Sequence, residues 1–472
     1  MKNLKLCVLP FTIALLLTAC GDGGADKNFK LINPEDTSML TANCKAYVDA
    51  MREQEKSLAD PYKYDDLGGE QGVNIDEGSK ADDERLYLDT GDPNGKNETR
   101  NTIPNRSDRN TGIELKFEPK AGAEADEYKV LVSDNANFEN AKEYTTNANS
   151  VTASNLRVNT EYYWKVVAGD KESKPAKFTT GDYPRWITAR SLSGEEGGRG
   201  IYNVRDLGGY MTNTGLRVKQ GLVFRGGEIT TMSSGGHYNT ITEVAKKAFR
   251  EDMDMVGGVE LDLRGASDIS DGYNACGFAE NGDIEYQQYA IKSYEQTFTQ
   301  TRTMVAPIFE ILKNANNKHV YFHCFGGADR TGTIGFLLNG VLGVSYTDLV
   351  IDFELTSYSS IDNEHIRSHI PGHEHRYDRW PALIDQLKTD TTGGYAWNEN
   401  AMLKDNIENF LVKACSVPQD TIDTIRSIML EPEQKETPKK GCGASITVSS
   451  SVIVLAALAG FGVFALRKKE EK

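Results

Sequence analysis

The feature that most constrains the fold is a strand, a glycine-rich loop and a helix that follow one another between residues 319 and 338. The run His319-Val-Tyr-Phe-His-Cys324 is typical of a buried strand. Phe-Gly-Gly-Ala-Asp-Arg-Thr-Gly332 comes next, and the apolar stretch after it predicts a helix that begins near Arg330. Such a loop points successive backbone N–H groups and the positive end of the helix dipole at one spot. The sequence therefore predicts an anion site.

Cys324 is expected at the floor of this loop. The field that attracts an anion also favours thiolate over thiol, and lowering a cysteine pKa by about three units takes roughly 4 kcal/mol. Thr331 can donate a hydrogen bond to the sulfur, and Arg330 can present its planar guanidinium to two phosphate oxygens. Gly326 and Gly327 allow a backbone approach that a side chain would block. The alternative is a tight structural turn around a buried cysteine.

The loop belongs to a region, residues 186–431, in which strand-like and helical patterns alternate. Strands are expected at 222–224, 259–263 and 319–322, and helices at 241–253, 301–314 and 333–342. This alternation predicts an α/β domain with a mostly parallel central sheet flanked by helices.

A second region, residues 111–182, has the period of two that is typical of antiparallel strands. Strands are expected at 113–117, 128–132 and 162–167, with turns rich in Asn, Asp and Gly between them. The run Asn155-Leu-Arg-Val-Asn-Thr-Glu-Tyr162, followed by Tyr-Trp-Lys-Val, resembles the sixth strand of fibronectin type III domains, and Phe178-Thr-Thr180 resembles their last strand. The resemblance implies a small all-β sandwich, a module that is usually a spacer or a binding platform.

Both ends of the chain carry membrane signals. Residues 1–19 combine lysines with an apolar run that ends in Leu17-Thr-Ala-Cys20, which resembles the lipobox of bacterial lipoproteins. The alternative is an ordinary secretory signal. The apolar stretch 446–466 can span a bilayer as a helix, and the basic tail 467–472 is expected in the cytoplasm. We therefore expect the protein at the extracytoplasmic face of a bacterial cell membrane, held by lipidated Cys20, the C-terminal helix or both.

The remaining segments are polar. Residues 20–110 are predicted as an acidic arm with a possible helix near 39–56, and residues 432–445 as a linker. The net charge of −16 argues against non-specific nucleic-acid binding, which needs a cationic surface. No Cys-x-x-Cys pair suggests zinc, and five cysteines remain besides Cys7 and Cys20. An odd number outside the cytoplasm indicates a free thiol.

Several motifs together resemble the cysteine-dependent phosphatases, in particular the atypical bacterial secreted family that acts on tyrosine, serine and lipid phosphates. The matching segments are Asn203-Val-Arg-Asp-Leu-Gly-Gly-Tyr210, Gly215-Leu-Arg-Val-Lys-Gln-Gly221, Phe224-Arg-Gly-Gly-Glu228, Leu261-Asp-Leu-Arg264, the loop from His323 to Gly332, and the closing helices around 407–430. The resemblance covers about half of the chain, and it implies no cofactor and no metal.

The resemblance implies a role for each loop residue. Cys324 attacks the phosphorus of a phosphorylated protein or lipid, and Arg330 holds the phosphoryl oxygens. Asp329 protonates the leaving oxygen, and Thr331 stabilises the departing thiolate. The resemblance also implies that the bound phosphate is contacted by the following residues of the loop and of an earlier motif: Phe325, Gly326, Gly327, Ala328 and Arg225.

The choice of proton donor stays open. Asp262, in the Asp-Leu-Arg motif, is a second candidate acid, although a structural role fits it better. Asp329 has an alternative role in bonding loop N–H groups. Ala328 stands where the family commonly has lysine, which weakens the case for phosphoinositide substrates unless Arg225 or Arg264 supplies the missing charge.

Four histidines, His365, His369, His373 and His375, lie close together after the loop helix. We expect them on a surface lid, and a bound metal is the alternative. The competing class of function is a non-catalytic surface binding protein or adhesin that uses a phosphatase-like fold to hold phosphorylated ligands. The intact Cys, Asp and Arg set favours the enzyme.

Overall fold

The computed structural model describes residues 26–64, 110–189, 201–229, 231–233, 236–238, 242–265, 284–359 and 380–432. The predicted signal segment with Cys20, the predicted membrane helix at 446–466 and the clustered histidines lie outside these residues. Within the described ranges, no helix is long and apolar enough to cross a bilayer.

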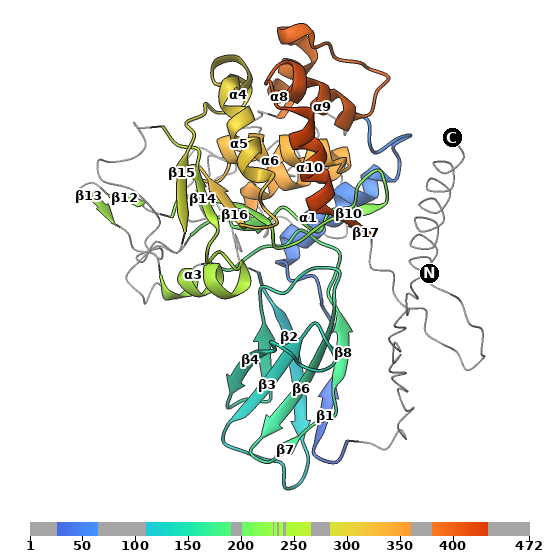
Figure 1. The fold of residues 1–472 in the computed structure, drawn as a ribbon. Helices are drawn as coiled ribbons and strands as arrows, with labels where there is room; N and C mark the ends of the chain where they lie inside the picture. The colour runs from blue at the N-terminus through green and yellow to red at the C-terminus, as the bar shows by residue number, and fades with distance from the viewer. Residues whose placement is uncertain are drawn as a thin grey trace, which may run out of the picture. The chain divides into compact units, whose positions relative to one another are not determined.

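Two antiparallel sheets build the β-rich region (Figure 1). One contains β1 (Phe29–Ile32), β2 (Ile113–Pro119) and β5 (Ser150–Ala153). The other contains β3 (Tyr128–Ser133), β4 (Lys142–Thr146), β6 (Glu161–Ala168), β7 (Lys171–Glu172) and β8 (Ala176–Thr179). Burial alternates along β2 and β6, so each sheet turns one face inward. The inward side chains share one core that includes Phe117, Val130 and Trp164. The fibronectin type III assignment stays a prediction.

A second five-stranded sheet has the order β15-β14-β16-β11-β9. Its strands are β9 (Arg205–Asp206), β11 (Val223–Gly226), β14 (Val259–Asp262), β15 (Glu285–Gln288) and β16 (Val320–His323). The pairs β11–β16, β14–β16 and β14–β15 are parallel, and β9 pairs antiparallel with β11. The register places Gly226 and Asp262 opposite His323. The carboxyl ends of the central strands therefore meet at one edge, directly before Cys324.

Helices follow and cover this sheet (Figure 1). They are α3 (Glu243–Lys247), α4 (Glu295–Gln300), α5 (Val305–Leu312), α6 (Asp329–Leu342), α7 (Tyr346–Glu354), α8 (Trp380–Thr389), α9 (Leu403–Lys413) and α10 (Gln419–Met429). Shorter turns are a π-helical segment at Ala248–Asp252 and 3-10 turns at Arg302–Met304, Leu355–Tyr358 and Thr392–Gly394. The hairpin β12 (Thr231–Ser233) with β13 (Gly236–Tyr238), and the pair β10 (Leu216–Val218) with β17 (Leu430–Pro432), complete the described elements.

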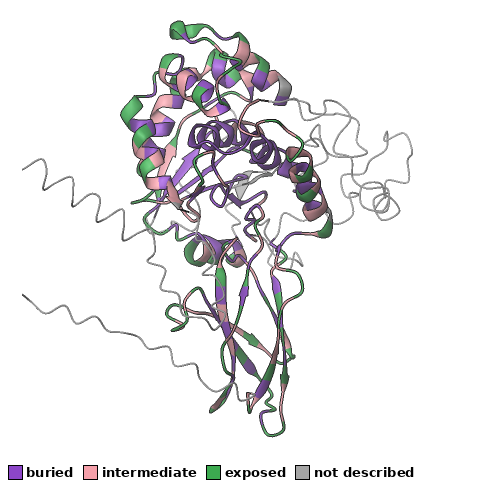
Figure 2. Ribbon diagram, turned by 90° about the vertical axis from the view of Figure 1, so that its right-hand side faces the viewer, coloured by how far each residue is buried: buried purple, intermediate pink, exposed green. Residues whose placement is uncertain are grey.

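Helix α6 lies at the centre of this packing. All its residues from Thr331 to Leu342 are buried, and those of α7 are buried too, as the purple helices at the centre of Figure 2 show. The helix ends at Gly343, whose φ of 90° is readily adopted by glycine and whose N–H bonds back to the last turn. The loop before α6 is thus attached to a rigid, buried element.

The polar arm contributes to both cores. Its strand β1 pairs with β2 of the β-rich region. Its helix α1 (Ala42–Glu55) places Cys44, Tyr47 and Met51 in the same hydrophobic cluster as the sheet and helices of residues 201–432. The Tyr47 hydroxyl donates to Glu354 on α7 over 2.7 Å. The start of the described chain is therefore part of the folded structure, although composition predicts a loosely ordered arm with only a possible helix.

Candidate active site

The loop between β16 and α6 is pressed against the end of β11. Gly327 has a φ of 67°, a conformation that strains any residue with a side chain. A Cβ at this position would lie 2.3 Å from the carbonyl carbon of Gly226, so the space is closed as well. Backbone bonds complete the contact, because the Glu228 N–H donates to the Phe325 carbonyl over 2.9 Å. Glycine at 327 lets the loop curl tightly beside β11.

Cys324 is 3% exposed and lies where this loop begins. Burial alone would raise its pKa, but the charge of Arg330, together with the nearby hydroxyl and N–H of Thr331, brings the pKa below its ordinary value. The other buried cysteines that the structure describes behave differently. Burial raises the pKa of Cys44 and of Cys415 to about 12 in each case. Among these three cysteines, the loop therefore singles out Cys324 as the one whose pKa is lowered.

Asn203 holds the loop from behind. Its Nδ2 donates to the carbonyl oxygens of Gly326 and Gly327, each over 3.1 Å, and to Thr356 Oγ1 over 3.0 Å. These bonds fix the path of the loop backbone at Gly326 and Gly327. Asparagine suits this position because its amide NH2 group can donate to more than one oxygen.

A buried charge cluster supports the same carbonyls. Arg225 donates from Nη2 to the Gly327 carbonyl over 2.8 Å and from Nη1 to Asp352 Oδ2 over 2.5 Å. Asp352 also accepts from Arg205 Nε over 3.3 Å. Burial and the neighbouring Arg225 lower the pKa of Arg205 to about 10, against the opposing effect of Asp352. One carboxylate on α7 thus balances two arginines beneath the loop.

The predicted site residues fall into two groups. Cys324, Asp329, Arg330 and Thr331 lie together in the loop and the first turn of α6. Phe325 is 50% exposed, while Gly326, Gly327 and Ala328 are buried in the loop backbone. Arg225 is fully buried and occupied by Gly327 and Asp352, so its guanidinium lies behind the loop.

The two candidate acids have different surroundings. Asp329 is partly exposed at the first position of α6 and accepts a hydrogen bond from the Tyr294 hydroxyl. Asp262 is fully buried and accepts from Arg264 through both oxygens, at 2.9 Å and 2.7 Å, and from the Tyr286 hydroxyl at 3.1 Å. Burial opposes ionisation of Asp262, but His323 and Arg264 hold its pKa below the usual range. Asp262 is therefore a poor proton donor at neutral pH.

Comparison with known families agrees with this geometry. Residues 198–431 match the tyrosine phosphatase family. This part of the chain is a tyrosine phosphatase domain. No curated protein matches the chain. The family match supports phosphatase activity and phosphorylated substrates in general, and it includes the whole segment from Asn203 to the end of α10.

Sequence reasoning missed several residues of the tyrosine phosphatase domain that support its loop. Asp352 and Tyr294 belong to no motif, and they reach the loop through α7 and the start of α4. Asn203 and Glu228 lie inside recognised motifs, but nothing in their spacing shows that they contact the loop. Helix α7 carries three buried carboxylates, Asp348, Asp352 and Glu354, so a buried charge alone does not single out Asp352.

Glu228 joins the tyrosine phosphatase loop to the Asp262–Arg264 pair. Its Oε2 accepts from Arg264 Nη1 over 2.7 Å. Burial raises the pKa of Glu228 to about 7, and the charge of Asp262 adds to the rise, against the opposing effects of Arg264 and His323. Next to this group, His323 bonds Glu260 over 3.0 Å. The strand edge below the loop is thus a network of buried ionisable groups.

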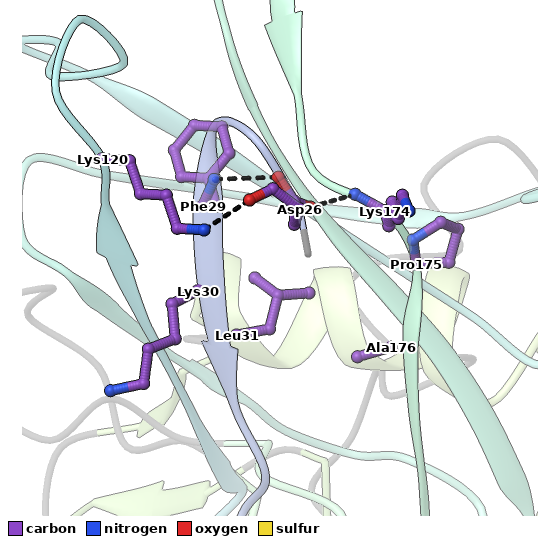
Figure 3. A pocket seen from close by; sticks show the side chains of 8 residues that line it. All are labelled: Asp26, Phe29, Lys30, Leu31, Lys120, Lys174, Pro175 and Ala176. Carbon is purple, nitrogen blue, oxygen red and sulfur yellow. Dashed lines mark hydrogen bonds between the residues drawn. The ribbon is translucent and has the colours of Figure 1, made fainter. Parts of the chain in front are cut away.

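The β-rich region has a pocket of its own, of about 390 Å³ (Figure 3). Asp26, Lys120 and Lys174 are among its lining residues, and Asp26 accepts from the Phe29 N–H over 3.0 Å. No cysteine or serine lines this pocket, so it does not offer the thiolate chemistry of the tyrosine phosphatase loop. In the described parts of the chain, no group of His, Cys, Asp and Glu side chains could hold a metal ion.

Proposed function

We propose that this domain hydrolyses phosphate monoesters, phosphotyrosine above all, through a cysteinyl-phosphate intermediate. The observation that carries the proposal is the contrast among three buried cysteines. Burial raises the pKa of Cys44 and Cys415 to about 12, whereas Arg330 and Thr331 lower that of Cys324. A thiolate at the floor of an amide-lined loop is the nucleophile that this chemistry needs.

In the first step the Cys324 sulfur attacks phosphorus, forming the S–P bond as the P–O bond to the leaving group breaks. Arg330 and the loop N–H groups hold the transferring phosphoryl oxygens. The carboxyl group of Asp329 gives its proton to the leaving oxygen, which departs as an alcohol or phenol. Asp329 suits this role because it lies at the mouth of the loop, partly exposed, while Asp262 is fixed to Arg264.

In the second step water attacks the phosphorus of the cysteinyl-phosphate. The Asp329 carboxylate accepts a proton from this water, and the S–P bond breaks to release inorganic phosphate and the thiolate. Thr331 stabilises the returning negative charge, since its hydroxyl and N–H act on the sulfur. Arg225 is proposed as a positioning residue, because it contacts the loop carbonyl of Gly327 and lies behind the loop.

Two observations favour phosphotyrosine over a lipid with several phosphates. The half-exposed ring of Phe325, next to the nucleophile, offers an aromatic surface for a phenyl ring. Arg225 and Arg264, which could replace the lysine missing at Ala328, are each bonded to buried carboxylates. Their charge is balanced within the protein. Phosphoserine and phosphoinositide turnover are outcomes that substrate profiling would reveal.

We also propose, from the sequence patterns alone, that the domain acts at the outer face of a bacterial membrane, with a fibronectin type III-like module beside it. Membrane fractionation of the full chain with and without Cys20→Ala tests the anchor. Recovery of the protein in the soluble fraction in both cases would contradict it.

Hydrolysis of para-nitrophenyl phosphate by the full chain tests the enzyme against the binding protein. We expect turnover that vanadate inhibits and EDTA does not, and that Cys324→Ser abolishes. The control is Cys415→Ala, which alters a buried thiol with a raised pKa and should keep activity. A folded protein that binds phosphate but shows no turnover would favour the alternative of a non-catalytic surface receptor.

A further inference from the structure

We propose that Tyr294 is a positioning residue for proton transfer: its hydroxyl bonds one oxygen of Asp329 and so orients the carboxyl group that exchanges the proton with the leaving group. This inference rests on the proposed function, in which Asp329 is the acid. The contact joins two elements that are far apart in sequence, because Tyr294 directly precedes α4 and Asp329 begins α6.

The backbone at Tyr294 is unusual. Its φ of 51° and ψ of −132° lie in a region that residues with side chains rarely occupy, which costs of order 1–3 kcal/mol. The surrounding turn is fixed by bonds from Thr297 N to the Tyr294 carbonyl (2.9 Å) and from Lys292 N to Thr301 Oγ1 (3.0 Å). Strained conformations that the surroundings hold in place are concentrated at functional sites. Here the strained backbone of Tyr294 places the tyrosine hydroxyl beside Asp329.

The ring of Tyr294 is held as firmly as its backbone. The residue is only 4% exposed, and its ring lies 6.3 Å, centroid to centroid, from Phe353 on α7. Phe353 in turn packs edge-on against Trp380 of α8 at 5.1 Å. A buried aromatic side chain with two χ angles has little freedom, so its hydroxyl is a fixed donor. The Asp329 carboxylate, partly exposed at the helix end, gains from it a single orientation.

The chemical consequence follows from the direction of the hydrogen bond. Tyr294 donates to Asp329 Oδ1, and this bond orients the carboxyl group that gives the proton to the leaving group. As the proton departs, negative charge grows on the carboxylate, and the donated bond strengthens. The same bond keeps the carboxylate oriented for the water of the second step. A fixed donor of this kind assists proton transfer without touching the phosphate.

The test compares Tyr294→Phe with Asp329→Asn on two substrates. Phenyl phosphate has a basic leaving group that needs a proton, whereas para-nitrophenyl phosphate has an acidic one that needs less. We expect Tyr294→Phe to lower kcat/KM about 10–100-fold on phenyl phosphate and less than about 3-fold on para-nitrophenyl phosphate. Inhibition by vanadate should stay unchanged, because the loop and Cys324 are intact. A merely structural role would lower both rates together.

Two further variants sharpen the result. Tyr163→Phe, in the β-rich region, removes a hydroxyl that bonds Glu161 over 2.8 Å and should change neither rate. Tyr286→Phe removes the hydroxyl that bonds Asp262. If Tyr286→Phe, and not Tyr294→Phe, lowered kcat/KM selectively on phenyl phosphate, the proposal would be overturned. If Asp329→Asn shows the selective loss and Tyr294→Phe does not, Tyr294 has no such role and the proposed acid stands. If Asp329→Asn shows none, the assignment of the acid fails, and the inference fails with it.

Discussion

Arg225 Nη1 lies 2.5 Å from Asp352 Oδ2, and neither side chain is more than 5% exposed. The pair connects the end of strand β11 to helix α7, and Arg225 extends the connection to the Gly327 carbonyl. The catalytic loop is therefore shaped by charges that never face the substrate. Its geometry depends on Arg225, which lies 102 positions before Gly327 in the chain.

Asp352→Asn should destabilise the domain strongly. The substitution leaves Arg205 and Arg225 buried without a counter-charge, and breaking such a pair costs about 3–5 kcal/mol. Urea unfolding followed by fluorescence measures the loss. The control is Glu118→Gln, whose partner Lys30 is exposed and whose salt bridge should be worth less than about 1 kcal/mol. Equal stability of Asp352→Asn and the parent would contradict a structural role for the cluster.

Gly327→Ala should abolish catalysis, because a Cβ at φ 67° meets the backbone of Gly226 at 2.3 Å and pushes the loop away from β11. A displacement of about 1 Å in a catalytic group costs about 100-fold in rate, so we expect at least that loss in kcat/KM. The matched control is Gly169→Ala, with φ 60° and no atom within 4 Å, which should cost about 1 kcal/mol of stability and leave the rate unchanged. Similar kinetic effects of the two substitutions would show that backbone strain alone matters.

The loop and its neighbours could be predicted from sequence because their chemistry is local. A strand, two glycines and a helix start fix the path of residues 319–332, and Cys324 follows from that path. Arg225 shows the limit. A motif places it near the phosphate, but only packing decides whether its guanidinium faces the substrate or the back of the loop. Tyr294 is a second residue that the sequence does not identify, because no motif or spacing shows that its hydroxyl contacts Asp329 on another helix.

The expected helix near 39–56 is confirmed by α1 (Ala42–Glu55), but the packing of the N-terminal arm could not be predicted, for a different reason. Its helix has polar residues on much of its surface, so composition indicates a weakly ordered segment. Burial of Tyr47 and Met51 becomes evident only when α7 is in place to receive them. Helices are stabilised mostly by tertiary packing, which a single sequence does not show.

Glu228→Gln should make the protein more stable at pH 8 than at pH 5, relative to the parent. The Glu228 pKa of about 7 exceeds its ordinary 4.5, so the folded state keeps a proton that the unfolded state has released. The parent therefore loses stability as pH rises between these values, by up to about 3 kcal/mol. Glutamine cannot ionise and still offers an oxygen to Arg264. Thermal unfolding of both proteins across this range gives the difference, and a constant gap would refute the raised pKa.

Met51→Ala should destabilise the tyrosine phosphatase domain although it lies in the N-terminal arm. Met51 is fully buried in the core shared with α7, and truncating a buried methionine costs about 2–5 kcal/mol. Because α1 and the catalytic helices share this core, activity and helical signal should disappear together at a lower temperature. Lys45→Ala is the control, since Lys45 is bonded to Asp49 at the surface and should cost under about 1 kcal/mol. If α1 unfolded in a separate, earlier transition that left activity intact, the arm would be an appendage, and a fragment starting at Trp186 would fold without it.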